Sequence, residues 1–266
     1  MKKICFLATC CLAMCLSACS GDKGSENGHE WVDLGLPSGT KWATCNIGAD
    51  NPQDYGNYYA WGEVTPKDVY NWSTYKYGYD KLTKYNIESR YGRNGFADGK
   101  TVLELEDDAA HFNWGGKWRM PTKAQQDELC ALCYWVWTES YDGSGVKGYI
   151  VYKAKAEADK GVKVFEDISP LSSYSLSDAH IFLPAAGYRY SGDLNQSNVG
   201  NSCELPAVGY RGGGDLNDAG SLGRYCSSSL NTDYPYDAWV VGFVSYDVYD
   251  NADYRCYGLS VRAVCK

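Results

Sequence analysis

The chain has 266 residues, of which 44% are hydrophobic and 22% charged, and its formal net charge is −8. An acidic chain without a basic patch is a poor partner for nucleic acid and for anionic lipid, so neither is expected to bind it. Its length fits one large domain or two small ones.

The first residues have the pattern of an export signal. Lys2 and Lys3 precede an apolar stretch at residues 4–14 that is too short to span a bilayer as a helix. The stretch ends in "LSAC", which resembles a bacterial lipobox. This resemblance implies removal of residues 1–18 and acylation of Cys19, which anchors the protein to a membrane. Because Ser20 follows, the outer membrane is the expected location. An ordinary signal with an incidental cysteine is the alternative.

A polar stretch links this signal to the folded part. Residues 19–30 contain the lipidated cysteine and "SGDKGSENG", which has no core-forming residue and is predicted to be a flexible tether. The remaining residues, 31–266, are expected to form a single domain. "WVDLGLPSGTKWATCNIGA" at residues 31–49 predicts a strand hairpin because a Pro-Ser-Gly turn separates two apolar runs.

The middle of the chain predicts one helix followed by short strands. Thr122 and Gln125 form a capping-box pattern, and we expect Leu129, Leu132, Cys133 and Val136 to share one face of the helix that follows. Further strands are predicted at residues 148–155, 161–167, 180–185, 238–245 and 257–264. One or two helices, many short strands and long loops indicate an α+β fold. "LPAAGYRYSGDLN" recurs as "LPAVGYRGGGDLN", which we interpret as a duplication within a surface loop.

Several motifs in order resemble one family. "WVDLGLPSGTKWATCNIGA", "YGNYYAWGE", "NWGGKWRMPT", "LPAAGYR", "YCSSS" and "YGLSVRAV" are similar to the Fibrobacter succinogenes major paralogous domain of Bacteroides-type lipoproteins. The resemblance covers residues 31–264 and implies a C-type-lectin-like fold related to that of formylglycine-generating enzymes. "YCSSS" departs from the Tyr-Trp-Ser-Ser common in the family, since Cys226 replaces the tryptophan.

The C-terminal segment, residues 205–265, contains no Lys, Glu, Gln or Met. Strands and turns favour residues of the remaining kinds. The segment also resembles the variable region of C-type-lectin-like proteins diversified by retroelements, in which adenine mutation yields Asn, Tyr, Asp, Ser, Ala, Val, Cys and Gly. Tyrosine, serine, asparagine and glycine are also characteristic of antibody paratopes.

We therefore predict a ligand-binding surface in this segment. Residues 246–256 are expected to form an irregular binding loop held between two framing strands, and the ligand is expected to be a glycan or a protein. The candidate ligand-binding residues are Tyr225, Ser227, Tyr246, Asp247, Tyr249, Asp250, Asn251, Asp253, Tyr254, Cys256 and Tyr257. The alternative is a structural component of the cell envelope or of fimbriae.

Catalysis and bound metal are not expected. The three histidines lie in no catalytic or zinc-binding motif, and no cofactor is predicted. The calcium-dependent sugar motifs of C-type lectins do not occur, and Glu104 and Glu106 are interpreted as a solvated acidic face. Cys130 and Cys133 form a CxxC without the partners of a zinc site. Cys226 and Cys256 do not match the metal-binding cysteine pair of formylglycine-generating enzymes, which leaves an oxidoreductase as the weaker alternative.

Overall fold

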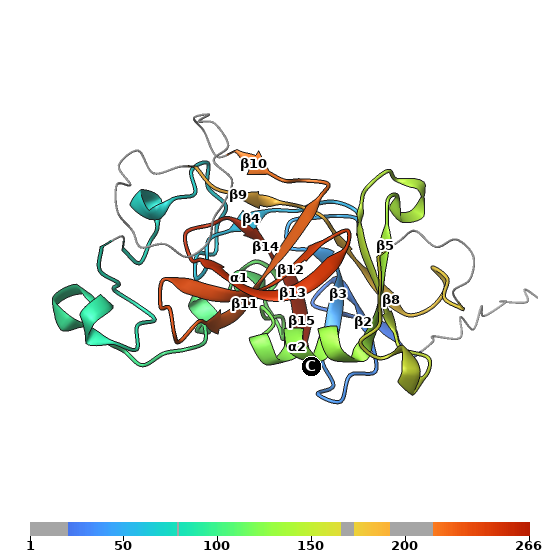
Figure 1. Ribbon diagram of the computed structural model, residues 1–266. Coiled ribbons are helices and arrows are strands. Elements are labelled where there is room, and N and C mark those ends of the chain that lie inside the picture. Colours follow the sequence, from blue (N-terminus) through green and yellow to red (C-terminus); the bar gives the residue numbers. More distant parts are fainter. Residues whose placement is uncertain (1–20, 79, 166–172, 192–214) are drawn as a thin grey trace, which may run out of the picture.

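The computed structural model describes residues 21–78, 80–165, 173–191 and 215–266. Over these residues the protein has a mixed α+β fold that is rich in sheet (Figure 1). The two α-helices are α1 (Ala109–Trp114) and α2 (Lys123–Leu132). The 3₁₀ turns are η1 (Trp72–Thr74), η2 (Ser89–Tyr91), η3 (Arg93–Gly95), η4 (Leu105–Asp107), η5 (Tyr141–Gly143) and η6 (Glu157–Asp159).

The largest sheet lies in the middle of the molecule and is called the central sheet. Its strands, in spatial order, are β13 (Asp247–Tyr254), β12 (Asp237–Val244), β11 (Leu222–Leu230), β14 (Leu259–Ser260) and β4 (Tyr58–Tyr59). Strands β11, β12 and β13 are antiparallel neighbours. One face of the sheet packs in a hydrophobic core with Trp135 and Tyr149, and β13 forms an edge.

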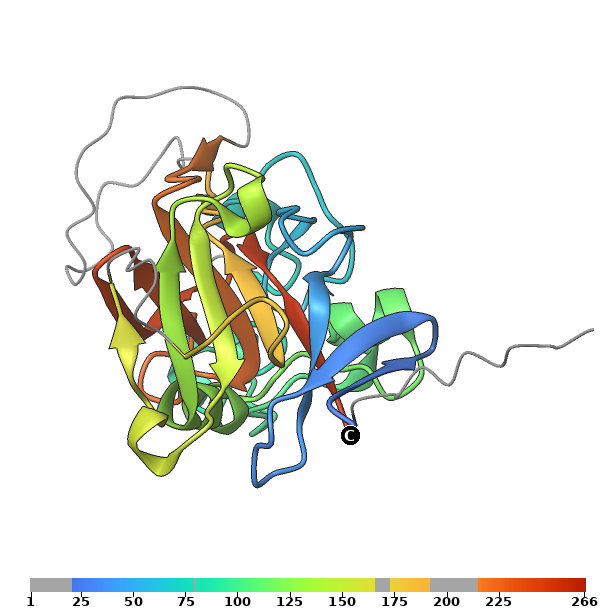
Figure 2. The ribbon, with the colours of Figure 1, turned by 90° about the vertical axis from the view of Figure 1, so that its right-hand side faces the viewer.

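A second sheet, called the lateral sheet, lies over that packed face (Figure 2). Its strands, in spatial order, are β7 (Lys163–Val164), β5 (Cys133–Thr138), β6 (Gly148–Lys153) and β8 (His180–Pro184). The predicted strands at residues 148–155 and 180–185 correspond to β6 and β8. The strand predicted at 161–167 shortens to β7, and residues 166–167 lie outside the described residues.

The third sheet, called the N-terminal sheet, joins the two ends of the chain. Its strands, in order, are β1 (Lys23–Glu26), β2 (His29–Asp33), β3 (Lys41–Asn46) and β15 (Arg262–Cys265). The predicted hairpin at residues 31–49 corresponds to β2 and β3. The tether differs from its prediction, because residues 23–26 form strand β1 and pair with β2. Strand β1 was missed because its side chains are polar and provide no hydrophobic alternation.

Helix α2 begins where the sequence predicts. The Thr122 side chain accepts a hydrogen bond from the Gln125 backbone N–H, and the Gln125 side chain bonds back to the Thr122 backbone N–H, which completes the capping box. The predicted helical face is wrong beyond Leu132, since Cys133 and Val136 belong to β5. The run "CYWVWT" explains the change, because aromatic and β-branched residues favour strands.

The remaining short strands bear on two sequence predictions. Strands β9 (Tyr188–Arg189) and β10 (Leu216–Asn217) form a small ribbon that joins the first copy of the internal repeat to the end of the second. Residues 192–214, which include most of the second copy and Cys203, lie outside the described residues. The strand predicted at 257–264 is divided into β14 and β15, which belong to different sheets.

Candidate functional site

The segment predicted as an irregular binding loop is mostly a strand. Residues 247–254 form β13, which pairs with β12 along its whole length through a hairpin turn at Ser245 and Tyr246. The sequence gives no alternation of apolar and polar residues here, because an edge strand with both faces partly exposed does not need one. The prediction of a loop between two framing strands is therefore wrong. The segment lies next to the strand predicted at residues 238–245, as expected, but β14 and β15 from the second predicted strand pair elsewhere.

Alternate residues of β13 project from one face of the central sheet. Asp247, Tyr249, Asn251 and Asp253 share this face, because side chains two residues apart point the same way in a strand. We call these four residues, together with Arg224 of β11, the β13 face. Burial increases along it, from the exposed Asp247 through the half-buried Tyr249 and Asn251 to Asp253, which is 6% exposed.

The other side chains of the hairpin contact helix α2 or solvent. Asp250 projects from the opposite face and lies 3.5 Å from the Nζ of Lys123 at the start of α2, and this ammonium also lies over the ring of Trp239. Tyr246 in the hairpin turn is 74% exposed, and Tyr254 at the end of the strand is 36% exposed. The hairpin therefore presents tyrosine and aspartate side chains on two faces and at its tip.

A buried ion pair anchors the inner end of the β13 face. The Nη1 of Arg224 donates a hydrogen bond to Oδ1 of Asp253, and the guanidinium lies 4.9 Å above the ring of Tyr188. The Asp253 Oδ2 and Arg224 Nε atoms have no hydrogen-bond partner among the described residues. Burial raises the pKa of Asp253, and the Arg224 charge offsets part of this effect.

Besides Asp253, four of the predicted ligand-binding residues are buried. Tyr225 lies on the packed face, where its hydroxyl donates to the Pro184 carbonyl at 2.9 Å, so its role is structural. Ser227 and Cys256 are 0% exposed, and Tyr257 is 4% exposed. These positions were misassigned because the amino-acid type alone does not distinguish an inward from an outward side chain, either in a strand such as β11 or in the turn that follows β13.

Tyr257 instead supports the end of β13. Its ring lies 5.4 Å from that of Tyr254 and 5.6 Å from that of Tyr188. The Tyr254 ring also lies 5.8 Å from that of Trp72. Contacts of this kind between rings fix aromatic side chains in place. Tyr257 therefore positions Tyr254 rather than contacting a ligand itself.

A second carboxylate lies close to the inner end of the β13 face. Asp237 at the start of β12 pairs in register with Tyr254. Burial and, next, the Asp253 charge raise the pKa of Asp237 to about 7, while Arg255 acts in the opposite direction. Its Oδ1 has no hydrogen-bond partner among the described residues. The region thus contains the buried Asp253 and the half-buried Asp237, whose ionisation the Asp253 charge disfavours.

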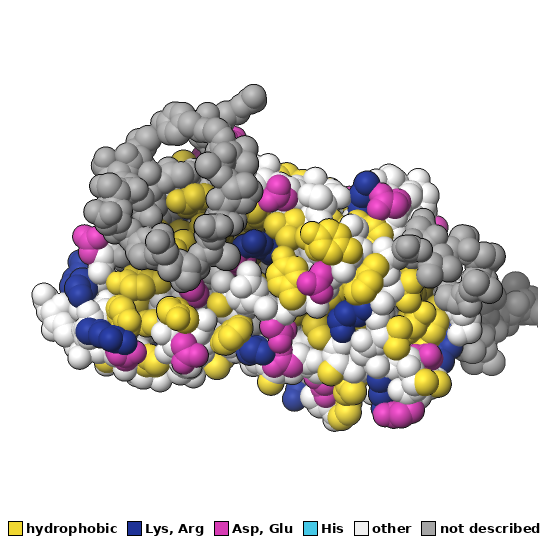
Figure 3. Space-filling view, in the orientation of Figure 1, with side chains coloured by type: hydrophobic (Ala, Val, Ile, Leu, Met, Phe, Trp, Pro, Cys, Tyr) yellow, Lys and Arg dark blue, Asp and Glu magenta, His cyan; other side chains and the backbone are white. Residues whose placement is uncertain are grey.

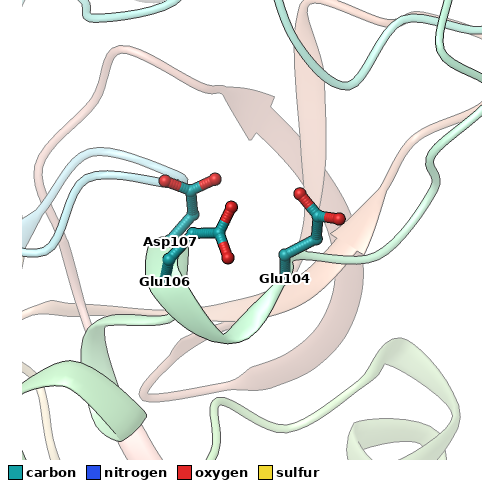
Figure 4. Close-up of side chains that lie close together, drawn as sticks. All are labelled: Glu104, Glu106 and Asp107. Carbon is teal, nitrogen blue, oxygen red and sulfur yellow. The ribbon is translucent and has the colours of Figure 1, made fainter.

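The acidic residues at 104–107 converge, but on a lysine. Glu104, Glu106 and Asp107 point to the same side of η4 (Figure 4). The Nζ of Lys84 lies 2.9 Å from Glu104, 3.2 Å from Glu106 and in direct contact with Asp107. The ammonium occupies the position that a cation would take. The cluster is a charge-compensated surface network in which Asp107 also accepts hydrogen bonds from Tyr77 and Tyr85.

The cysteines considered as reactive groups are reduced and shielded. Cys133 and Cys226 are buried, and Cys130 is partly exposed. Burial raises the pKa of the Cys226 thiol, and it raises that of Cys130 to about 12. A thiol with a raised pKa is a poor nucleophile and a poor metal ligand, because the thiolate is the reactive form. This chemistry argues against a redox role for Cys226 or for the CxxC pair.

Sequence reasoning missed three residues of the site, namely Arg224, Tyr188 and Asp237. Arg224 had a signal, because an isolated arginine within "LGRYCSSSL" needs a partner when the strand is buried, and the partner is Asp253.

No family model, curated protein or solved structure matches this chain. Within the described residues, no helix is both long and apolar enough to cross a membrane. Cys19, the predicted lipidation site, lies outside them.

Proposed function

We propose that the protein is a lipid-anchored, outer-membrane binding protein that recognises a glycan or protein ligand through the β12–β13 hairpin. The proposal places it in the Fibrobacter succinogenes major paralogous domain family, with a C-type-lectin-like fold. The observation that carries it is the hairpin itself. At the edge of the central sheet, it holds Asp247, Tyr249 and Asn251 in a regular strand geometry and Tyr246 in the adjoining turn, with all four side chains at least partly exposed.

The chemistry of these side chains supports binding rather than catalysis. Tyrosine supplies a large contact area at a low entropic cost, and its hydroxyl both donates and accepts hydrogen bonds. Asparagine and aspartate supply adaptable polar contacts. Figure 3 shows apolar, acidic and basic side chains intermixed over the face that carries β11–β13, the mixture expected of a polar recognition surface.

The rigidity of the hairpin supports the same proposal. Strand β13 pairs with β12 at every residue, and the Arg224–Asp253 ion pair fastens its end to β11. A surface that is already ordered loses less entropy when a ligand binds. The hairpin would therefore present its side chains in one arrangement, which suits a specific ligand.

Matched tyrosine variants test the binding function. The wild-type protein should retain ligands on a glycan array or capture partners from host-surface protein libraries, and Tyr246→Ala should weaken that binding by about tenfold or more. The control is Tyr234→Ala, because Tyr234 is similarly exposed, at 62% against 74%, but lies in the loop before β12. Equal loss in both variants, or no retained ligand, would favour a structural role in the envelope.

The membrane anchor requires a separate test. In cells fed an alkyne-labelled fatty acid, the wild-type chain should become labelled and fractionate with the outer membrane. Cys19→Ser should abolish both results, because the thiol is the acylated group. Labelling that survives this substitution would contradict the anchor without affecting the binding proposal.

A further inference from the structure

A groove of about 490 Å³ lies beside the end of β15, and no residue of the β12–β13 hairpin lines it. This volume is within the range of small-molecule sites in proteins. One wall comes from the segment that leads into η4 and from its first residue, and it includes Val102 and Leu105. The segment that leads into α2 supplies another, including Lys117, Arg119 and Met120.

The apolar part of the groove is aliphatic. Val102, Leu105, Met120 and Val264 line it, and none of the described lining residues carries an aromatic ring. Val102 is 44% exposed and Leu105 is 47% exposed, although both are large apolar side chains. Together in one groove, these side chains form an exposed apolar surface of the kind found in ligand-binding grooves. A groove without rings offers no stacking platform for a sugar or a base, so its surface fits an alkyl chain.

Three of the polar side chains that line the groove are already occupied. The Gln125 amide bonds to Thr122 and Thr40, and the Ser228 hydroxyl bonds to the Pro121 carbonyl. Asp108 is 2% exposed, and its oxygens accept hydrogen bonds from the backbone N–H groups of His111 and Met120. These groups are satisfied and attract no new polar ligand.

The cations are not balanced in the same way. Neither Lys117 nor Arg119 takes part in an ion pair among the described residues, although the chain as a whole carries a net charge of −8. Arg119 bonds to His111 Nδ1 and to backbone carbonyls, and the buried Asp108 carboxylate interacts with it electrostatically. Three cationic side chains, those of Lys117, Arg119 and Lys266, line the groove against the one carboxylate side chain of Asp108. The groove therefore carries an excess of positive charge on an acidic protein, and its electrostatic complement is an anion.

We infer that this groove binds a single-chain aliphatic carboxylate, such as a fatty acid. The alkyl chain lies along Val102 and Leu105, and the carboxylate faces Lys117 and Arg119. Binding removes two exposed apolar side chains from water and pairs a cation with an anion, so the chain and the head group contribute together.

Calorimetric titration of the purified protein with dodecanoate tests this assignment. We expect saturable binding of one dodecanoate per chain at concentrations below its micelle formation. Acetate, which lacks the chain, and dodecyltrimethylammonium, which has the opposite charge, should bind at least about tenfold more weakly. Equal affinity for the cationic amphiphile, or no saturable binding of dodecanoate, would overturn the proposal.

Two pairs of variants locate the site. Leu105→Asp should weaken dodecanoate binding by about tenfold or more, because it introduces a negative charge beside the chain. Leu176→Asp is its control, since Leu176 is 38% exposed and does not line the groove. Lys117→Glu should weaken binding several-fold, whereas Lys23→Glu should not. Thermal unfolding verifies that each variant is folded, and unchanged binding in folded Leu105→Asp and Lys117→Glu would refute the site.

Discussion

Two buried arginines connect distant segments of the chain mainly through backbone carbonyls and aromatic rings. Arg255 and Arg262 are each 1% exposed. Arg255 donates to the carbonyls of Lys84, Tyr85 and Pro235, and its guanidinium lies 4.6 Å above the Trp61 ring. Main-chain carbonyls and aromatic rings compensate these charges, which is possible because guanidinium has five donors in one plane. Each arginine thereby ties together segments distant in the sequence.

Asp237 gives the stability of the protein a defined dependence on pH. Its pKa is about 7 in the folded state, against 3.8 for an unperturbed aspartate side chain. Between these two values the unfolded chain loses the proton while the folded chain keeps it, so stability falls as pH rises through this window. Asp237→Asn should therefore be more stable than wild type at pH 8 and equally stable below pH 4. Urea unfolding at both pH values provides the measurement, and a constant difference would contradict the assignment.

The Arg224–Asp253 pair should behave as a unit. Arg224→Met leaves a buried carboxylate without its partner and should destabilise the protein by about 3 kcal/mol. The double variant Arg224→Met with Asp253→Leu should recover most of that loss, because it removes both charges. Chemical denaturation of the two single variants and the double variant forms a complete cycle. Additive losses would show that the two side chains do not interact.

Asp107 provides a contrasting case. Burial opposes its ionisation, but hydrogen bonds from Lys84, Tyr77 and Tyr85 outweigh that effect and lower its pKa to about 2. Its contribution to stability is present above the unfolded value near 3.8 and is lost as pH falls through about 2. Asp107→Asn should accordingly destabilise the protein at pH 7 and have little effect at pH 2. Loss of the same size at both pH values would contradict an ionic contribution.

At the level of secondary structure, the elements with strong local signals were predicted and the edge strands were not. The capping box at Thr122 set the start of α2 correctly, and the apolar runs at residues 148–155 and 180–185 identified β6 and β8. Strands β1 and β13 consist largely of polar residues at sheet edges. Their pairing depends on a neighbour distant in the sequence or on a turn, and hydrophobic periodicity does not report either.

The candidate site was predictable to a similar extent. Its location in the C-terminal segment and the exposed residues Tyr246, Asp247 and Asp250 follow from composition. The buried members Tyr225 and Ser227 could not be recognised, because their direction depends on the register of β11. Arg224 was missed because its partner Asp253 lies 29 residues further along the chain.

Close packing between β11 and β12 depends on a glycine. A Cβ atom at Gly223 would lie 2.0 Å from the Phe243 ring, which is fully buried. Gly223→Ala should therefore destabilise the protein by about 2 kcal/mol through overpacking. Gly21→Ala is the control, since its Cβ would have no atom within 4 Å. Equal melting temperatures for both variants would contradict this packing.

For the molecule as a whole, the C-terminal strand β15 completes the N-terminal sheet. Strand β15 pairs with β3, and Arg262 donates hydrogen bonds to the carbonyls of Ala43, Thr44 and Phe182. Deletion of residues 262–266 should therefore abolish the cooperative unfolding transition measured by circular dichroism. Deletion of Lys266 alone, which is exposed and outside β15, should leave it intact. A cooperative transition in the longer deletion would show that β15 is dispensable.

The pairing of β15 with β3 also sets the time at which this protein can fold. A ribosome that has produced β3 must add more than two hundred further residues before the partner strand exists. Contacts between such distant segments form slowly and late. The N-terminal sheet therefore stays incomplete through most of synthesis, although β2 and β3 are made early. For the lipid-anchored protein proposed above, this delay would favour passage through a secretion channel, which requires an unfolded chain.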